Sequence, residues 1–167
     1  MTLNNISYDN GDIKLAARGI KMNWINFFGL IIVLLMLIPN MIYYKKNSTF
    51  SNKCKSMVMN TLEQLGRYGS MLWMVAPFGK KELGFHSKEE FAVWLIVMPI
   101  LVLMYLILWG IYFKKTSFIL SMSLAIIPSI IFISQGYFLR HGALLLFGVL
   151  FAIGHIYVTY INAKENK

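Results

Sequence analysis

Long apolar runs alternate with short polar stretches along most of the chain. Four runs contain no Asp, Glu, Lys or Arg, and each is long enough to cross a hydrocarbon core as an α-helix, which takes about 20 residues. They cover residues 25–44, 91–113, 117–138 and 142–161. Aromatic residues gather near their ends, as expected for rings that settle at the headgroup level of a bilayer. The pattern predicts four transmembrane helices.

A fifth segment, residues 57–78, carries only two charges, Glu63 and Arg67. A glutamate followed four residues later by an arginine lies on one face of a helix in the favourable order, so the two charges can neutralise each other. Gly66 and Gly69 would let a neighbouring helix approach closely. We therefore expect residues 57–78 to form a fifth span, in an all-α, polytopic bundle.

An alternative treats residues 52–67 as a basic interfacial helix. The remaining apolar piece, residues 68–78, would then be too short to cross and would be re-entrant or packed on the bundle. The fold in that case is four transmembrane helices plus one interfacial or re-entrant element.

Composition agrees with the membrane prediction. Of 167 residues 57% are hydrophobic and 14% charged, with a mean hydropathy of +0.60, which excludes an ordinary soluble domain. We expect one integral membrane domain over residues 1–167, in which a polar segment, 1–24, precedes the first span. The very short connections at 114–116 and 139–141 make the helices that they join antiparallel neighbours.

Charge and cysteine content narrow the function classes. Lys and Arg outnumber Asp and Glu by 16 to 7, but no basic stripe with interleaved aromatics lies outside the apolar runs, so we expect no nucleic-acid partner. Cys54 is the single cysteine, which excludes an intrachain disulfide. No metal-ligand spacing, phosphate loop or nucleophile motif occurs, and we expect no cofactor, no metal and no catalytic residue.

Lysine pairs suggest an orientation in the cell membrane. Lys45 with Lys46 and Lys114 with Lys115 abut span ends that five crossings place on one side. Because basic residues next to spans favour the cytoplasmic side, we predict that the N-terminus lies outside and the C-terminus inside.

Five spans would bring several polar residues to one depth. Asn40, Glu63 and His155 each lie within about 9 Å of span ends on the same membrane face, with Arg67 about one turn deeper. These four residues form a candidate intramembrane polar site. Two interpretations stay open: a hydrogen-bonded knot that fixes helix register, or a site that binds an ion or polar headgroup or passes protons.

Two further features concern the surface of the bundle. Gln135, Arg140 and His141, at the opposite membrane face, are a candidate headgroup-contacting loop. Small residues recur every fourth position on one helix face, which serves packing within the chain or, alternatively, a homo-oligomer or another membrane protein. They are Ser117, Ser121, Ala125 and Ser129.

The sequence leaves three functions. We expect first a small multi-pass membrane protein that is non-enzymatic and acts in binding, as an accessory or in interactions, with an intramembrane Glu63–Arg67 pair. The alternatives are a transporter or channel subunit that uses the polar site, and a lipid-modifying membrane enzyme that uses Arg140 and His141.

Overall fold

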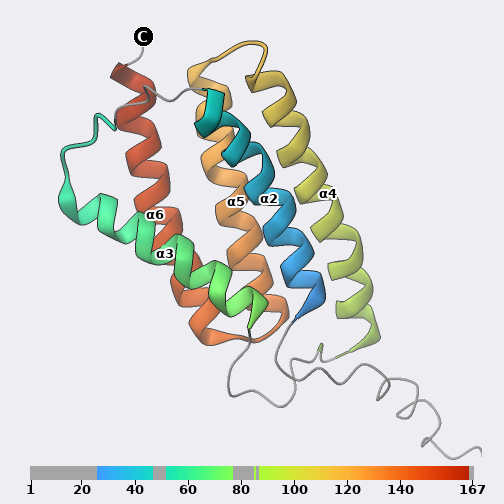
Figure 1. Cartoon of the computed structure of the whole chain (residues 1–167). Helices are drawn as coiled ribbons and strands as arrows, with labels where there is room; N and C mark the ends of the chain where they lie inside the picture. The colour runs from blue at the N-terminus through green and yellow to red at the C-terminus, as the bar shows by residue number, and fades with distance from the viewer. Residues whose placement is uncertain (1–25, 47–51, 77–84, 86, 166–167) are drawn as a thin grey trace, which may run out of the picture.

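The chain is an all-α bundle, as predicted (Figure 1). The computed structural model describes residues 26–46, 52–76, 85 and 87–165; the predicted polar segment 1–24 lies outside them. Within these residues there are five helices and no strand. The helices are α2 (Phe27–Lys46), α3 (Met57–Val75), α4 (Lys88–Tyr112), α5 (Phe118–Phe138) and α6 (Gly142–Glu165).

Four of these helices are long and apolar enough to cross a membrane: α2, α4, α5 and α6. These four apolar helices suggest a membrane protein. Helix α6 continues to Glu165, beyond the predicted end at residue 161, because helical hydrogen bonding does not stop where the apolar run does. Helix α3 is less apolar, since Glu63, Gln64 and Arg67 interrupt it. The five-span count therefore stays a prediction.

Serine caps fix where two helices begin. The Ser56 hydroxyl accepts a hydrogen bond from the Met59 amide at 3.4 Å, and Ser87 accepts one from the Glu90 amide at 3.2 Å. Such side chains satisfy amides that have no partner within the first turn of a helix. Residues 52–56 have no regular secondary structure, so α3 starts only after several non-helical residues.

Helix α3 lies antiparallel along α6, crossing it obliquely in Figure 1. At one end the Lys53 amide donates to Asn162 Oδ1 at 2.8 Å. At the other end the rings of Trp73 and His141 are 5.0 Å apart. The segment 52–76 thus runs from the C-terminal end of α6 to the residue that precedes it.

Glycines allow the backbones of α3 and α6 to pack closely. A Cβ added to Gly66 would lie 2.3 Å from the backbone nitrogen of Phe151, and one added to Gly154 would lie 2.4 Å from that of Glu63. Backbone atoms cannot move aside as a side-chain tip can. The close packing expected at Gly66 is present.

Helix α6 packs on its other side against α5. A Cβ on Gly148 would lie 3.2 Å from the Ile133 nitrogen of α5, whereas Gly154 faces α3. Glycines six residues apart lie on different faces of a helix, and here each face has its own neighbour. This is why their spacing carries no signal of a single interface.

The start of helix α2 contacts the end of α3. The Asn26 amide donates to the Val75 carbonyl at 2.7 Å, and a Cβ on Gly29 would lie 2.1 Å from the Met74 carbonyl oxygen. The interior between α2, α4 and α5 holds large apolar side chains, among them Met36, Met98 and Phe132.

The small-residue face of α5 is partly covered within the chain. Ala125 and Ser129 are buried, and the Ser129 hydroxyl donates to the Ala125 carbonyl at 2.8 Å. Ser121 and Ser117 are half-buried, and the Ser121 hydroxyl donates to the Ser117 carbonyl at 3.1 Å. The two buried residues serve packing inside one molecule.

Candidate functional site

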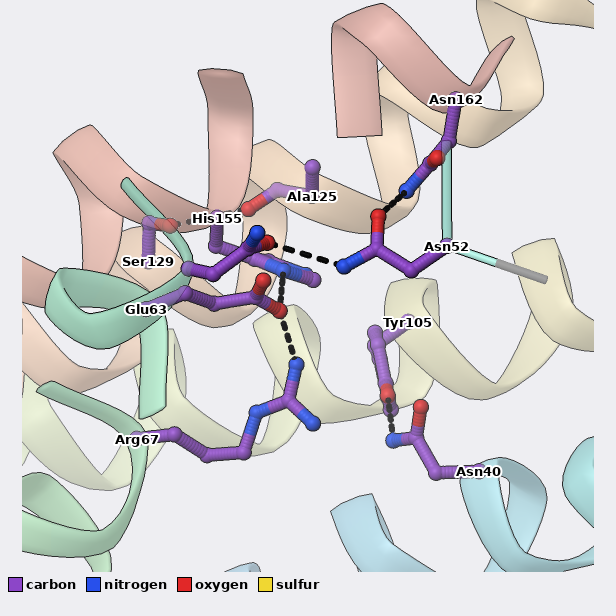
Figure 2. A network of polar contacts seen from close by, with 10 residues as sticks. Asn40, Asn52, Glu63, Arg67, Tyr105, Ala125, Ser129, His155 and Asn162 are labelled. Carbon is purple, nitrogen blue, oxygen red and sulfur yellow. Dashed lines mark hydrogen bonds and ion pairs between the residues drawn. The ribbon is translucent and has the colours of Figure 1, made fainter. Parts of the chain in front are cut away.

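The carboxylate of Glu63 joins α3 to α6. Its Oε1 accepts a hydrogen bond from Arg67, one turn further along α3, and lies 2.9 Å from His155 Nδ1 on α6 (Figure 2). Glu63 is buried. We call Glu63, Arg67 and His155 the Glu63 cluster.

The inner face of α3 positions this carboxylate. Glu63, Gly66, Ser70 and Met74 are the buried residues of the helix, and their spacing of three and four residues places them on one side. That side meets α6 where Gly154 removes the steric barrier to the Glu63 backbone. His155 follows Gly154 directly, so its ring lies within reach of the carboxylate.

Phe151 supports both partners of Glu63. Its ring stacks on the His155 imidazole, with centroids 4.6 Å apart and an interplanar angle of 17°. The Arg67 guanidinium lies 5.9 Å from the same ring centroid. A cation at this distance from an aromatic face is attracted by the electrons of the ring.

The cluster lies far from both ends of α6. His155 is thirteen residues from Gly142 and ten from Glu165, so it lies roughly 20 Å and 15 Å along the helix from these ends at a rise of about 1.5 Å per residue. The cluster thus lies near the middle of α6.

Chemically, the cluster combines an acid, a permanent cation and an imidazole. The charges of Glu63 and Arg67 cancel, which lowers the cost of placing them among apolar helices. The cluster is not fully enclosed: 33% of the Arg67 side chain and 20% of the His155 side chain are exposed.

Asn40 belongs to a different contact. Its Nδ2 donates to the Tyr105 hydroxyl at 2.7 Å and to the Met36 carbonyl at 2.8 Å (Figure 2). The predicted intramembrane polar site grouped Asn40 with Glu63 and His155. The structure joins Glu63 to His155 and pairs Asn40 with Tyr105 of α4. Tyr105 was missed, although a tyrosine in the middle of an apolar span is itself a signal.

A second polar cluster, also missed, lies where α6 ends. Asn52 Oδ1 accepts from Asn162 Nδ2 at 3.2 Å and from the Cys54 amide at 3.0 Å, and Asn52 Nδ2 donates to Asn60 Oδ1 at 2.9 Å. Asn60 Nδ2 donates to the Cys54 carbonyl at 2.9 Å. These bonds hold the segment 52–56 against α6, where Cys54 is buried.

The predicted headgroup-contacting loop divides into buried and exposed parts. Gln135 is buried and accepts a hydrogen bond from Trp94 Nε1. His141 is also buried, and its Nδ1 accepts from the Leu144 amide at 3.1 Å, so it caps α6. Arg140 alone of the three is exposed, with Glu90 3.4 Å away. The lipid-modifying alternative thus has no exposed imidazole at this loop.

Arg140 has a left-handed backbone, with φ of 50°. The His141 amide donates to the Gly136 carbonyl at 2.9 Å and the Arg140 amide to the Tyr137 carbonyl at 3.0 Å. This is the hydrogen-bond pattern that ends many helices, in which glycine is the usual residue. It lets the chain turn directly from α5 into α6.

The described residues hold no group of three or more His, Cys, Asp or Glu side chains that could bind a metal ion. No protein-family model, curated protein or solved structure matches this chain.

Proposed function

We propose that this chain is a non-enzymatic membrane protein that acts by binding or interacting with another membrane component, with α3 as its fifth crossing. The observation that carries this proposal is the pairing of the buried Glu63 carboxylate with both Arg67 and His155. Of the acidic residues in the described part of the chain, only Glu63 lies inside the bundle, and its Oε1 is engaged by Arg67 and His155. A carboxylate used in this way fixes one helix against another.

The fifth crossing is supported by the pairing of α3 with α6. Lys53 meets one end of α6, Glu63 meets its middle, and the Trp73 ring contacts that of His141, the residue before its start. If α6 crosses the membrane, the segment 52–76 covers the same depth. A helix lying in the membrane plane would meet α6 at one level only.

The orientation proposed is N-terminus outside and C-terminus inside. Lys53 Nζ donates to the Glu165 carbonyl at 3.1 Å, so the start of segment 52–76 and the end of α6 share one end of the bundle. Lys45 and Lys46 in the last turn of α2 and Lys164 in that of α6 support a cytoplasmic location for that end.

A transporter or channel subunit is the second candidate. Its specific support is the partial exposure of Arg67 and His155 at mid-depth, because an ion or proton pathway needs access to a titratable group. In this alternative Glu63 changes its protonation or its partner during each cycle.

Purified protein in proteoliposomes tests the two candidates. We measure the flux of protons, and of Na⁺, K⁺ and Cl⁻, for the unchanged chain, for Glu63→Gln and for Glu63→Gln with Arg67→Gln. The interaction proposal expects no flux above that of empty vesicles from any of the three. Flux by the unchanged chain that Glu63→Gln abolishes, while the variant stays folded, would overturn it in favour of transport.

A further inference from the structure

A surface pocket of about 380 Å³ lies where the turn between α5 and α6 meets the first turn of α4. We call it the Arg140 pocket; it is lined by Glu90, Gly136, Tyr137, Arg140, Gly142 and Leu145. In Figure 1 the start of α4 and the turn from α5 to α6 lie at the same, lower end of the bundle. Both α5 and α6 are long and apolar enough to cross a membrane. When they do, the short turn between them, and the pocket with it, lies at the headgroup level of the bilayer.

The Arg140 pocket carries charges of both signs. Arg140 Nη2 lies 3.4 Å from Glu90 Oε1, and 56% of the Arg140 side chain and 34% of the Glu90 side chain are exposed. An ion pair this exposed contributes little to the stability of a fold. A ligand can therefore reach both groups, provided that it brings an anion to Arg140 and a cation to Glu90.

The backbones that carry these two side chains are fixed. The Glu90 amide donates to the Ser87 hydroxyl at 3.2 Å, and the Arg140 amide donates to the Tyr137 carbonyl at 3.0 Å. Arg140 also has a φ of 50°, in the left-handed region that glycine occupies at no steric cost. A residue with a long side chain at such a position stores backbone strain, and strain of this kind is concentrated at functional sites.

An apolar stripe leads from the pocket along α5 towards the middle of the membrane. Tyr137, Ile130, Ile126 and Ile119 are all exposed, and their spacings of seven, four and seven residues place them on one helix face. Tyr137 also lines the pocket, so the stripe begins at the pocket rim. A tyrosine at headgroup level above aliphatic side chains suits a lipid whose acyl chain lies along the helix.

The geometry points to a binding site for a phospholipid whose headgroup carries a phosphate and a primary ammonium group, as phosphoethanolamine does. The phosphate lies next to the Arg140 guanidinium, whose planar fork of N–H donors matches phosphate oxygens. The ammonium lies next to the Glu90 carboxylate and donates hydrogen bonds to it. A headgroup with only negative charge is repelled by Glu90. A quaternary ammonium brings the positive charge but has no N–H to donate.

This site differs from the headgroup-contacting loop expected from the sequence. Glu90 and Tyr137 line it together with Arg140, whereas Gln135 and His141 are buried and are not among its lining residues. The lipid site rests on the proposed function, since it names a phospholipid as a membrane component that the chain binds. It does not need α3 to cross the membrane.

Lipid titration followed by native mass spectrometry tests the Arg140 pocket. The full-length chain in detergent is titrated with phosphatidylethanolamine and phosphatidylcholine of the same acyl chains. These lipids share their phosphate and net charge and differ in the ammonium group. We expect phosphatidylethanolamine to bind about two- to fivefold more tightly, as for one partly exposed ion pair. Equal dissociation constants would overturn the assigned headgroup.

Three variants locate the binding. Glu90→Gln should remove the preference for phosphatidylethanolamine, and Arg140→Asn should weaken both lipids by about two- to fivefold. Asparagine is well accepted at a left-handed backbone position. Glu89→Gln is the matched control, because Glu89 is exposed in the same first turn of α4 and does not line the pocket.

Circular dichroism establishes that each variant is folded before its lipid affinity is compared. A preference that survives Glu90→Gln, or one that Glu89→Gln removes as well, would contradict the site. So would unchanged lipid binding by Arg140→Asn.

Soluble phosphoethanolamine distinguishes a lipid from a free ligand of the same chemistry. Without acyl chains it makes no contact with the stripe on α5, so we expect its dissociation constant to be at least about tenfold higher than that of the lipid. Equal affinity would overturn the lipid assignment in favour of a water-soluble zwitterion.

The lipid site and the interaction function fail in distinguishable ways. Ion flux in proteoliposomes argues against the interaction function whichever lipid is preferred. No lipid preference together with no flux overturns the lipid site alone and leaves the interaction function with a different partner.

Discussion

His155 Nδ1 lies 2.9 Å from Glu63 Oε1, although 92 residues separate them in the sequence. This contact joins the middle of α6 to the least apolar helix of the bundle. Because Arg67 shares the same carboxylate oxygen, three residues and two helices depend on one group.

Glu63→Gln and Arg67→Gln should each destabilise the protein. The double variant should lose less stability than the two single variants lose together. Removing one partner of a buried ion pair lowers the free energy of unfolding by about 3–5 kcal/mol. We expect a loss of about 1–3 kcal/mol here because Arg67 is partly exposed. Unfolding in detergent, followed by circular dichroism, measures this. Strictly additive losses would show that the two side chains are not coupled.

Gly154→Ala should separate α3 from α6. The new methyl group would lie 2.4 Å from the Glu63 nitrogen, and overpacking of this kind costs about 1–3 kcal/mol. Gly110→Ala is the matched control, since a Cβ on this α4 glycine meets nothing within 4 Å. It should be neutral or stabilising by up to about 1 kcal/mol. Equal thermal stability of the two variants would contradict the close contact of α3 with α6.

Asn162→Ala should expose Cys54. The substitution removes the bonds from Asn162 to the Lys53 amide and to Asn52, which hold segment 52–56 against α6. Two lost hydrogen bonds of about 1 kcal/mol each correspond to roughly tenfold or more in the population of an opened segment. We therefore expect maleimide labelling of Cys54 in detergent to be slow in the unchanged chain and about tenfold faster in the variant.

Asn40→Ala controls for a general loss of stability in that experiment, because Asn40 contacts α4 and lies outside the asparagine cluster. Faster labelling of Cys54 in both variants would mean that the cluster does not protect the thiol specifically.

Topology mapping should place Lys53 and the C-terminus on one side of the membrane and Arg140 on the other. A Cys54→Ser chain with Lys53→Cys, Lys115→Cys or Arg140→Cys, treated in intact cells with an impermeant maleimide, reports each side. With the C-terminus inside, only Arg140→Cys should be labelled before permeabilisation. Labelling of Lys53→Cys from the side opposite to Lys115→Cys would remove α3 as a crossing.

The helices could be predicted from the sequence because the length of an apolar run is a local property of the chain. Each of the four apolar runs was predicted to within a few residues, and the ends differ only where a cap such as Ser87 or a continuing helix such as α6 extends the run. The pairing of Glu63 with Arg67 was equally accessible, since one helical turn separates them.

Tertiary structure decided which polar residues meet. Depth along a span can be counted from sequence, but the rotation of each helix about its axis depends on packing against neighbours. Rotation directs His155 towards Glu63 and Asn40 towards Tyr105, although Asn40, Glu63 and His155 were expected near one depth. It also buries Gln135 and His141 and leaves Arg140 outside. The sequence by itself thus determined a membrane bundle and a charged pair, and only the packing of α3 on α6 turned that pair into a cluster with His155.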